Sequence, residues 1–408
     1  MWLYNLGISL YAGGIRLAAL WHGKARLWSE GRRNIFERME AAVRPSDRIV
    51  WVHAASLGEF EQARPIIERL RAEHPEYKIL LTFFSPSGYE IRKNYEGADY
   101  VFYLPADTPS NARRFLDIVH PEIAIFIKYE FWINLLSELR RRKVRSYIVS
   151  AIFRRNSVFF RPYGAMWRQA LETFDTLFVQ NGESKRLLSE IGFDNVVVAG
   201  DTRFDRVAQI AAAAQRVETI ERFRGGGRLF VAGSTWGPDE EILLPLVNAN
   251  PDVKFVIAPH EMDEGRIAHL MRDAKGGAVR YTQCDAATRF DDVQVLVLDT
   301  MGMLSSVYGS ATWAYVGGGF GVGIHNTLEA ATFGLPIAFG PNYGKFKEAR
   351  DLVTLGAARS VKNYDELRTW FIPLRDNEDF LLKTSRIAKD YTTRHQGATN
   401  IIVKTIFH

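Results

Sequence analysis

Short apolar runs alternate with longer amphipathic stretches through the first half of the chain. Runs rich in β-branched and aromatic residues predict strands, and stretches with apolar residues three and four positions apart predict helices. Helical patterns at 60–73 and 111–118 lie between such runs. The predicted strands are 49–54, 78–84, 100–104, 122–127, 146–150, 176–179 and 196–199. This rhythm predicts repeated strand–helix–strand units on a parallel sheet.

The second half of the chain begins the same rhythm again. An alanine-rich segment at 208–227, which ends in three glycines, separates the halves. The predicted strands after it are 229–233, 254–258, 278–281, 295–298, 313–316 and 336–339. The sequence therefore predicts an α/β protein of two doubly wound domains with a cleft between them. Ligands of such domains bind beyond the carboxyl ends of the strands.

The first 28 residues have a pattern of their own. They are apolar and aromatic, but Asn5, Gly13, Gly14 and Arg16 interrupt them. A spanning helix needs about 20 nearly uninterrupted apolar residues. A helix lying in the membrane interface is therefore favoured over a spanning helix or one buried in the protein, with the tryptophans as anchors.

Three segments follow from these patterns. Residues 1–28 are predicted to form a membrane-associating helix, residues 29–207 an N-terminal domain, and residues 208–408 a C-terminal domain. A final helical stretch at 380–405 could pack back on the N-terminal domain. A chain of 408 residues is longer than one core usually organises, which agrees with two domains.

Composition narrows the environment and the partners. The lone Cys284 excludes an intramolecular disulfide and a cysteine-rich zinc module, and a reducing compartment fits it best. The net charge is +5, and eight basic residues stand against one acidic residue at 138–161. Such a stretch suits anionic lipid or an acidic substrate. Nucleic acid is a poor candidate because no recognition motif accompanies the charge.

Three common motifs are missing. The glycines at 319, 321 and 323 do not have the spacing of a dinucleotide-binding fingerprint, and neither Gly-Lys pair is followed by Ser or Thr as in a P-loop. The segment beginning at His260 has Glu264 where a zinc-protease helix has its second histidine. A dehydrogenase, a P-loop nucleotidase and a zinc hydrolase are therefore not the first interpretations.

Ser56 and Glu59 stand where a predicted strand passes into a helix. The Ser-x-x-Glu pattern is a capping box, in which both side chains satisfy free amides at the start of the helix. The same position at the edge of the cleft also suits a general base that takes a proton from an acceptor hydroxyl. Both interpretations stand on the spacing alone.

Two more charged residues follow predicted strands. Glu130 lies among aromatic residues and needs a cationic partner or a raised pKa, so it is either functional or part of an ion pair with a nearby arginine. Arg203 could hold a phosphate or a carboxylate in two contacts. Its alternative is an ordinary surface pair with Asp201 or Asp205.

The segment after the strand at 313–316 has five glycines in seven residues, from Gly317 to Gly323. Such a loop lets backbone amides approach a phosphate, and the helix after it adds the positive end of its dipole. Glu329 is placed to accept hydrogen bonds from a ribose diol. Ser234 and Thr235 precede another helix start of the kind that holds anions. A purely structural glycine loop is the alternative.

Taken together, these segments resemble a known family. The glycine loop running into 325–330, followed by 334–336 and 339–342, is similar to the donor-binding segment of GT-B glycosyltransferases. With the motifs at 55–59, 129–132, 200–205, 233–235 and 299–302, the chain resembles the 3-deoxy-D-manno-octulosonic acid (Kdo) transferases. The matches run in order from about residue 50 to residue 350.

The resemblance implies a GT-B fold and an inverting, metal-independent transfer of Kdo from CMP-Kdo to lipid A precursor, without a cofactor. It places the enzyme on the cytoplasmic side of the inner membrane, with an anionic membrane surface as a partner. Glu59 falls on the general base, and Glu130 and Arg203 on positions that stabilise the transition state. Ser56, Gly58, Arg154 and Arg155 fall on the acceptor and membrane side. The donor-binding positions are Ser234, Thr235, Pro259, His260, Gly302, Met303, Leu304, Gly319, Asn326, Thr327, Leu328 and Glu329.

Two alternatives remain open. Another GT-B enzyme, such as a UDP-sugar transferase or a sugar-nucleotide epimerase, would share the glycine loop and Glu329. A membrane-binding scaffold without activity would keep the fold alone, although Glu59 and Glu130 stand where packing does not require carboxylates. The chain also departs from the common family motifs at His260, Met303 and Thr327, which leaves the contacts to CMP open.

Overall fold

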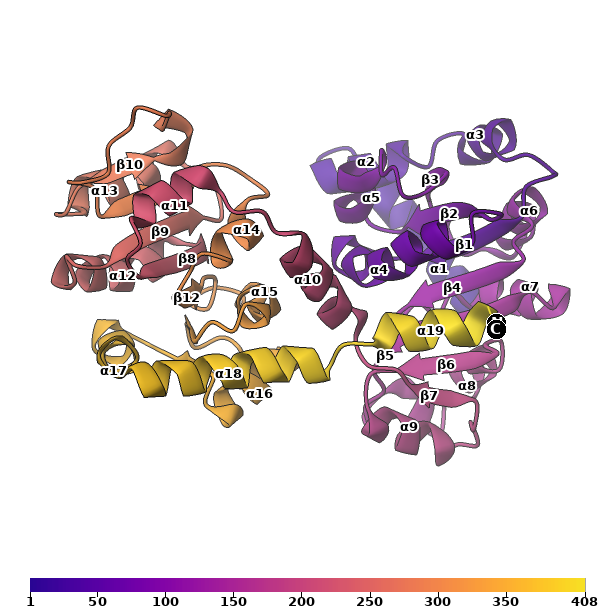
Figure 1. The fold of residues 1–408 in the computed structure, drawn as a ribbon. Helices are drawn as coiled ribbons and strands as arrows, with labels where there is room; N and C mark the ends of the chain where they lie inside the picture. The colour runs from indigo at the N-terminus through magenta and orange to yellow at the C-terminus, as the bar shows by residue number, and fades with distance from the viewer. Residues whose placement is uncertain (408) are drawn as a thin grey trace. The chain divides into compact units, whose positions relative to one another are not determined.

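The computed structural model describes residues 1–407 and divides into two compact units (Figure 1). Unit 1 holds Met1–Arg206 together with the segment from Gln396 onward, and unit 2 holds Val207–His395. Each unit is built on one parallel sheet covered by helices. The chain passes from unit 1 to unit 2 within helix α10 (Thr202–Ala213).

The sheet of unit 1 has the strand order β3-β2-β1-β4-β5-β6-β7, and every strand pair is parallel. After β3 the chain crosses to the other side of β1, so the direction of strand addition reverses between β1 and β4. The strands are β1 (Ile49–His53), β2 (Lys78–Phe83), β3 (Tyr100–Tyr103), β4 (Ile123–Ile127), β5 (Arg145–Ala151), β6 (Thr176–Val179) and β7 (Val196–Val198).

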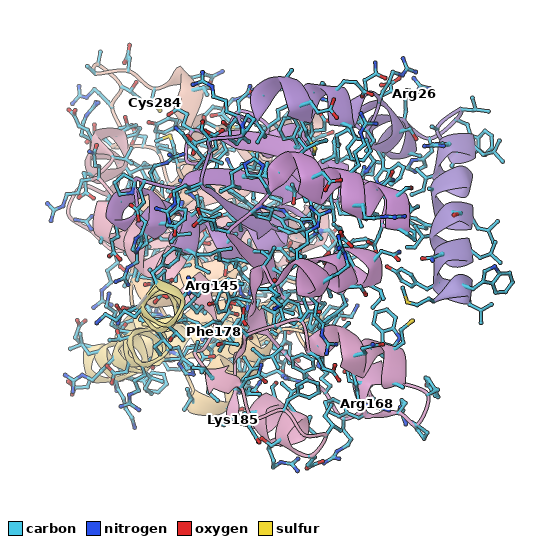
Figure 2. The ribbon with its side chains drawn as sticks, turned by 90° about the vertical axis from the view of Figure 1, so that its right-hand side faces the viewer. Arg26, Arg145, Arg168, Phe178, Lys185 and Cys284 are labelled. Atoms are coloured by element: carbon cyan, nitrogen blue, oxygen red, sulfur yellow. The ribbon has the colours of Figure 1, made fainter. Side chains whose placement is uncertain are left out.

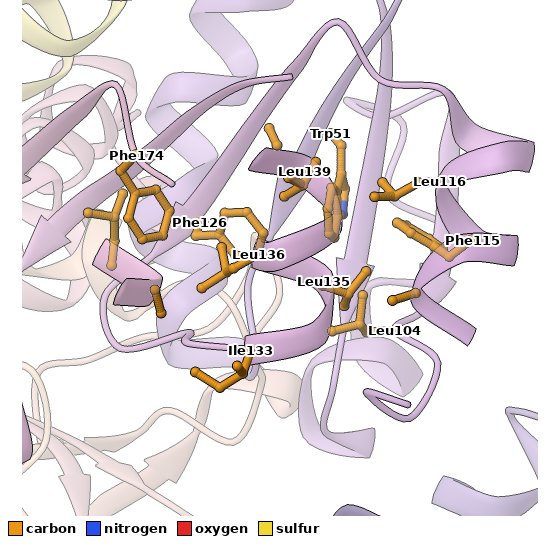
Figure 3. Close-up of a cluster of buried hydrophobic side chains, with 14 of the residues drawn as sticks. Trp51, Leu104, Phe115, Leu116, Phe126, Ile133, Leu135, Leu136, Leu139 and Phe174 are labelled. Atoms are coloured by element: carbon orange, nitrogen blue, oxygen red, sulfur yellow. The ribbon is translucent and has the colours of Figure 1, made fainter. Parts of the chain in front are cut away.

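Helices cover both faces of this sheet because each presents one apolar stripe. Trp51, Phe115, Phe126, Leu136 and Phe174 form much of one buried layer (Figure 3). The helices are α1 (Trp2–Ala18), α2 (Gly23–Glu30), α3 (Ile35–Ala42), α4 (Leu57–Glu73), α5 (Pro86–Arg92), α6 (Pro109–Val119), α7 (Ile133–Arg142), the short η1 (Val158–Phe160), α8 (Ala165–Leu171), α9 (Gly182–Ser189) and α19 (Ala398–Phe407).

Unit 2 repeats this plan with the strand order β10-β11-β9-β8-β12-β13-β14, again all parallel. Its strands are β8 (Leu229–Thr235), β9 (Lys254–Pro259), β10 (Ala278–Arg280), β11 (Val295–Val297), β12 (Trp313–Val316), β13 (Ile337–Phe339) and β14 (Ala358–Ser360). Its helices are α11 (Glu218–Arg224), α12 (Gly237–Ala249), α13 (Glu264–Asp273), η2 (Tyr281–Gln283), α14 (Leu304–Tyr308), α15 (Thr327–Thr332), α16 (Lys347–Leu355), α17 (Tyr364–Asp376) and α18 (Glu378–Arg394). The direction in which successive strands are added to the sheet reverses between β8 and β12.

The structure confirms the prediction of two parallel-sheet α/β halves, and each predicted strand exists within two residues of its expected ends. Strand β14 was not predicted, because it is only three residues long and carries an exposed arginine in its middle. The single helical stretch expected at 380–405 is interrupted. It forms α18 in unit 2 and α19 in unit 1, with Gly397 in a left-handed conformation between them.

The first 28 residues form two helices rather than one, since the chain turns at 19–22 between α1 and α2. Helix α1 has no buried residue, and Trp2, Leu3 and Leu10 on it are exposed. The alternative of a helix buried within the protein is therefore wrong for α1. Within residues 1–407, no helix has the length and apolar character needed to cross a bilayer.

Candidate functional site

Several of the polar residues singled out from the sequence lie at the reversal point of a sheet. In unit 1, Ser56, Glu59 and Glu130 follow β1 and β4, and in unit 2, Ser234, Thr235 and Glu329 lie at or beyond the ends of β8 and β12. Arg203 instead follows the edge strand β7, and His260 and Gly302 follow β9 and β11. In a doubly wound sheet, neighbouring strands at this point send their following helices to opposite faces, which opens a crevice at the carboxyl edge. We call the group in unit 1 the carboxylate cluster: His53, Ser56, Glu59, Glu130 and Trp132.

Glu59 lies in the first turn of α4, whose first residue follows Ser56. The Ser56 hydroxyl donates a hydrogen bond to the Glu59 carboxylate, and among the described residues it accepts no bond from a helix amide. The serine half of the predicted capping box is therefore not formed. Gly58 beside it is exposed, and a methyl group at that position would meet nothing closer than the Ser56 hydroxyl at 3.8 Å. Glu59 is thus half-buried next to an exposed glycine.

Glu130 is held by His53 and Trp132. The Trp132 Nε1–H donates to its Oε2 over 2.8 Å, and the Nε2 of the fully buried His53 lies 3.1 Å from the same oxygen. The alternative of an ion pair between Glu130 and an arginine is wrong. The Nδ1 of His53 lies 2.9 Å from the Thr82 hydroxyl and 3.1 Å from the Thr82 carbonyl oxygen. The Trp132 indole nitrogen and the His53 ring therefore both contact one carboxylate oxygen of Glu130.

Arg203 is paired with Asp201 at the start of α10. Its Nε and one terminal nitrogen lie 2.9 and 2.8 Å from the same carboxylate oxygen, and its backbone N–H donates to the other. Asp201 is buried and also accepts from the Gln62 amide at 2.9 Å. Burial raises the pKa of Asp201, but the Arg203 charge and these hydrogen bonds outweigh it and hold the pKa below its usual range. The structure therefore confirms Asp201, one of the two partners in the alternative interpretation, but the carboxylate is buried rather than at the surface.

Tyr129 connects these groups electrostatically. Burial raises the pKa of the Tyr129 hydroxyl, Arg154 lowers it, and Asp201 and Glu59 raise it further. These three charged groups therefore lie within electrostatic reach of one phenol. Lys128, next to it, has a φ of 62°, which few non-glycine residues adopt and which is frequent at functional sites. The structure brings Glu59, Asp201 with Arg203, and the segment that carries Glu130 to one region of unit 1.

The basic residues between 140 and 155 are less available to bind an anionic lipid or substrate than the sequence indicates. Arg155 pairs with Glu190 through both terminal nitrogens, at 2.6 and 3.0 Å, and Arg154 is exposed. Arg141 and Arg142 of α7 share Glu138. Hydrogen bonds from Arg141, with those from Arg142, lower the pKa of Glu138 to about 2. Much of the positive charge at 140–145 is therefore neutralised within the unit.

In unit 2, several loop glycines serve close packing. A methyl group on Gly317 would lie 2.2 Å from the Ser234 carbonyl oxygen, and one on Gly319 would lie 2.5 Å from the Gly340 Cα. The Gly318 N–H donates to Asp239 of α12, a buried carboxylate that also accepts from Tyr315. Gly319 is therefore a buried packing position. The exposed part of the loop is Gly321–Val322.

A stack of three rings lies between the loops after β8, β9 and β12. His260 lies between Trp236 and His325, with ring centroids 4.8 and 4.3 Å away. The Trp236 Nε1–H donates to His325, and burial, aided by His260, lowers the pKa of His325 to about 4. His325 is thus neutral at pH 7, while His260 is exposed.

Glu329 is held by two short side chains. The Ser305 hydroxyl donates to one carboxylate oxygen at 2.9 Å, and the Asn326 amide donates to the other at 3.0 Å. Asn326 also caps α15 by accepting from the Leu328 N–H. Thr327 and Leu328 are buried, so Leu328 belongs to the core. Both oxygens of Glu329 have fixed directions.

The remaining predicted donor residues are spread over three elements. Thr235 ends β8, where its hydroxyl donates to Glu240, and Ser234 before it has a φ of 54°. Pro259 is buried at the end of β9. Gly302 is exposed, and Met303 and Leu304 are half-buried at the start of α14. Residues 1–407 contain no group of three or more His, Cys, Asp or Glu side chains arranged to hold a metal.

Sequence reasoning missed five side chains that shape the site: His53, Trp132, Trp236, His325 and Ser305. Two of them had a signal. His53 ends a strand that is otherwise apolar, and Trp132 follows Glu130 by two positions. Their partnership is not visible in the sequence, because 79 positions separate them.

Solved structures with a similar fold include enzymes that act on nucleotide sugars. The UDP-GlcNAc 2-epimerase of Neisseria meningitidis matches 88% of this chain and 99% of its own, with a TM-score of 0.61 and 17% identity. MurG of Acinetobacter baumannii also matches 88% of this chain and 99% of its own, with a TM-score of 0.55 and 13% identity. At these identities the likeness concerns the fold, which is the GT-B arrangement of two Rossmann-like domains.

Sequence comparison is more specific. A family model described as 3-deoxy-D-manno-octulosonic-acid transferase (kdotransferase) matches residues 32–206. The 3-deoxy-D-manno-octulosonic acid transferase of Bordetella pertussis is 28% identical over 366 residues, which are 86% of this chain and 85% of that protein. The transferase of the same description from Aquifex aeolicus is 27% identical over 330 residues, 78% of this chain and 84% of that protein. Residues 32–206 thus match the 3-deoxy-D-manno-octulosonic-acid transferase model, and over most of its length the chain is similar to transferases of that description.

Proposed function

We propose that the protein transfers Kdo from CMP-Kdo to a hydroxyl of lipid A precursor, with Glu59 as the general base. The observation that carries the proposal is the state of Glu59. Its carboxylate lies at the reversal point of the sheet, accepts from the Ser56 hydroxyl and is not part of a completed capping box. The residues matched by the family model include Glu59, Glu130 and Arg203.

The proposed reaction is a single displacement. The acceptor oxygen forms a bond to the anomeric carbon of Kdo, the bond from that carbon to the CMP phosphate oxygen breaks, and CMP leaves with the electron pair. Glu59 takes the proton of the acceptor hydroxyl. One displacement inverts the anomeric centre. The sugar gains positive character on the way, so a fixed carboxylate such as Glu130 stabilises it.

Other groups suit the two ends of the reaction. Arg203 presents a cation that can stabilise negative charge on the sugar carboxylate or the departing phosphate. In unit 2, Glu329 has both oxygens fixed and suits a ribose diol, and the exposed amides at Gly321–Val322 suit a phosphate. We propose that these groups and the ring of His260 hold CMP. We further propose that the reaction needs no metal and no cofactor.

The exposed helix α1 supports a place for the protein at a membrane surface. Trp2, Leu3 and Leu10 are not covered by the rest of unit 1, whereas Tyr4 packs against its core, and a helix with such an exposed apolar face binds at the interface of a bilayer. We propose that the protein associates peripherally with the cytoplasmic side of the inner membrane, where it meets its lipid acceptor.

Donor and acceptor specificity test the proposal. The protein is incubated with lipid A precursor and either CMP-Kdo or UDP-GlcNAc, with and without EDTA, and nucleotide release and lipid mass are measured. We expect CMP release only when the lipid is present, a mass increase of one or more Kdo units, and no effect of EDTA. Turnover of UDP-GlcNAc instead would favour the related epimerase and transferase activities.

A further inference from the structure

A cavity of about 740 Å³ lies in unit 1 among α1, α2, α3 and the segment between β3 and α6. Four arginines line it: Arg16, Arg26, Arg32 and Arg33. The acidic side chains in its wall are Glu30 and Glu37, and Glu37 contacts Arg114. The wall therefore carries a surplus of positive charge that the unit does not neutralise.

Arg32 is the most unusual of these residues. Its guanidinium lies 3.9 Å from the centroid of the Trp28 ring and 4.6 Å from that of Tyr103. It donates to the carbonyl oxygens of Phe84 and Leu104 at 2.8 Å and of Trp28 at 3.1 Å. No carboxylate within residues 1–407 pairs with it. Burial without an anion lowers the pKa of Arg32, so an anionic ligand would complete its environment.

Two further donors in the same wall lack a partner. The Trp28 indole Nε1 and the Ser29 hydroxyl are buried and have no hydrogen-bond partner in the described part of the chain. Trp28 as a whole is only 5% exposed. An indole N–H can only donate, and both atoms are closed off from solvent, so a ligand reaches them only if the side chains around them move. Buried donors normally have partners, and these two lie beside a guanidinium that has no carboxylate partner, which makes acceptor oxygens of a ligand suitable here.

A phosphate group fits this set of donors. It has several acceptor oxygens and a negative charge, and arginine side chains bind it through two parallel hydrogen bonds. A carboxylate offers fewer oxygens to an indole, a hydroxyl and a guanidinium at the same time. The chemistry of the wall therefore favours phosphate.

The surroundings indicate that the phosphate belongs to a lipid. Leu20 lines the cavity, and it is exposed together with Leu17 and Trp21. Figure 2 shows Arg26 beside the N-terminal helix, and its Nε donates to the Ala19 carbonyl oxygen at the end of that helix. Exposed apolar side chains at the mouth of a phosphate cavity suit acyl chains, with the phosphate at the depth of the arginines.

The cavity is also connected to the carboxylate cluster. The Phe84 ring lies 5.0 Å from the Arg32 guanidinium and 4.6 Å from the Trp132 ring, and Trp132 donates to Glu130. Two aromatic side chains, Phe84 and Trp132, thus separate the cationic wall from Glu130.

We propose that this cavity binds a phosphate group carried by a lipid. Two lipids can supply it: the acceptor of the transfer reaction or a phospholipid of the surrounding membrane. The first source rests on the proposed function, whereas the second does not.

The test uses the full chain and matched variants. Arg26→Gln/Arg33→Gln removes two exposed cationic side chains from the wall, and Trp28→Phe removes the unpartnered N–H without changing the charge. The control is Arg161→Gln/Lys185→Gln, which removes the same charge from exposed positions elsewhere in unit 1. Lys185 and Arg26 lie at opposite ends of the view in Figure 2. Thermal unfolding checks that each variant is folded.

Three measurements separate the sources: sedimentation with phosphatidylcholine vesicles containing phosphatidic acid, the KM for the acceptor in detergent, and calorimetry with inorganic phosphate. We expect both cavity variants to weaken either vesicle binding or acceptor binding about tenfold or more, because hydrogen bonds to a charged group are lost. The control variant should behave like the unmodified protein. An increased acceptor KM assigns the acceptor, and weaker sedimentation assigns the phospholipid.

The proposal is overturned if the control variant loses as much as the double cavity variant, because general surface charge then explains the binding. It is also overturned if Trp28→Phe behaves like the unmodified protein, or if inorganic phosphate binds while neither lipid interaction changes. A protein that transfers nothing would count against the proposed function and would leave the sedimentation result valid.

Discussion

Glu130 has a more rigid environment than Glu59, although both follow strands of the same sheet. One oxygen of Glu130 receives the Trp132 N–H and faces the buried His53, whereas Glu59 has the single contact from Ser56. A stabilising charge works best when fixed, and a base must be able to accept a proton from a ligand. The two environments agree with the two proposed roles.

Trp132→Phe tests the fixing of Glu130. A smaller aromatic ring replaces the indole, and the carboxylate loses its 2.8 Å donor. A hydrogen bond to a charged group contributes about 1.5–3 kcal/mol, so we expect kcat to fall about 10- to 100-fold with little change in the KM for CMP-Kdo. Steady-state kinetics measure both constants. Trp167→Phe, on α8 in the same unit, is the control, and equal losses in both variants would contradict the account.

The predicted partners of single residues were the least successful part of the sequence interpretation. An ion pair with an arginine was one of two interpretations of Glu130, but its partners are a histidine 77 positions away and a tryptophan two positions away. Hydrogen bonds between distant segments depend on the register of strands and on rotamers, which local patterns do not contain. The alternatives for Glu59 and Arg203 remained open for the same reason.

The elements themselves were largely predictable, because buried parallel strands are continuous apolar runs. Strands β6 and β12 have the ends that the sequence predicts. The short β14 and the division between α18 and α19 were missed. The first has too few apolar positions to give a pattern, and the second depends on the left-handed Gly397 within an otherwise helical stretch.

Helix α7 illustrates how charges within an element affect stability. Glu138 has a pKa of about 2 in the folded protein, against an ordinary value of 4.5, because Arg141 and Arg142 donate to it. A lowered pKa contributes stability above the ordinary pKa, and this contribution is lost as the pH falls toward the folded pKa.

We therefore expect Glu138→Gln to lower the free energy of unfolding at pH 7 by about 1–2 kcal/mol. The difference from the unmodified protein should shrink as the pH falls from 4.5 toward 2. Urea unfolding at several pH values measures it. Glu172→Gln, which removes an exposed pair with Arg140, should have almost no effect. A constant difference at all pH values would contradict the assignment to this carboxylate.

The close packing of the loop after β12 against the loop after β13 can also be tested. Gly319→Ala places a methyl group 2.5 Å from the Gly340 backbone, so the loops after β12 and β13 must separate. Overpacking of this kind costs about 1–3 kcal/mol. We expect a lower unfolding temperature and weaker CMP binding by calorimetry.

Gly321→Ala is the control for this loop, since its methyl group would meet nothing closer than 3.7 Å. It should keep the stability of the unmodified protein. If Gly319→Ala is equally stable and binds CMP normally, the close packing of the two loops is not what the glycine provides.

At the scale of the molecule, each unit has carboxylate side chains beyond the strands at the reversal point of its parallel sheet. Unit 1 presents carboxylates and an arginine, which suits proton transfer and charge stabilisation, and unit 2 presents a glycine loop and a fixed Glu329, which suits a nucleotide. The order of strands and helices along the chain was enough to predict this plan. The cavity beside α1 was not predictable, because it forms where three consecutive helices meet the distant segment around Pro105 and Ala106.

The central claim is that Glu59 is the general base of Kdo transfer. The most direct test measures transfer to lipid A precursor by Glu59→Gln, with Glu73→Gln on the exposed end of the same helix as the control. Glutamine keeps the shape and can still accept from Ser56, but it cannot take a proton at neutral pH. We predict that Glu59→Gln lowers kcat by about 10²–10⁴ with normal CMP-Kdo binding and an unchanged fold, while Glu73→Gln is fully active. Near-normal transfer by Glu59→Gln would contradict the claim.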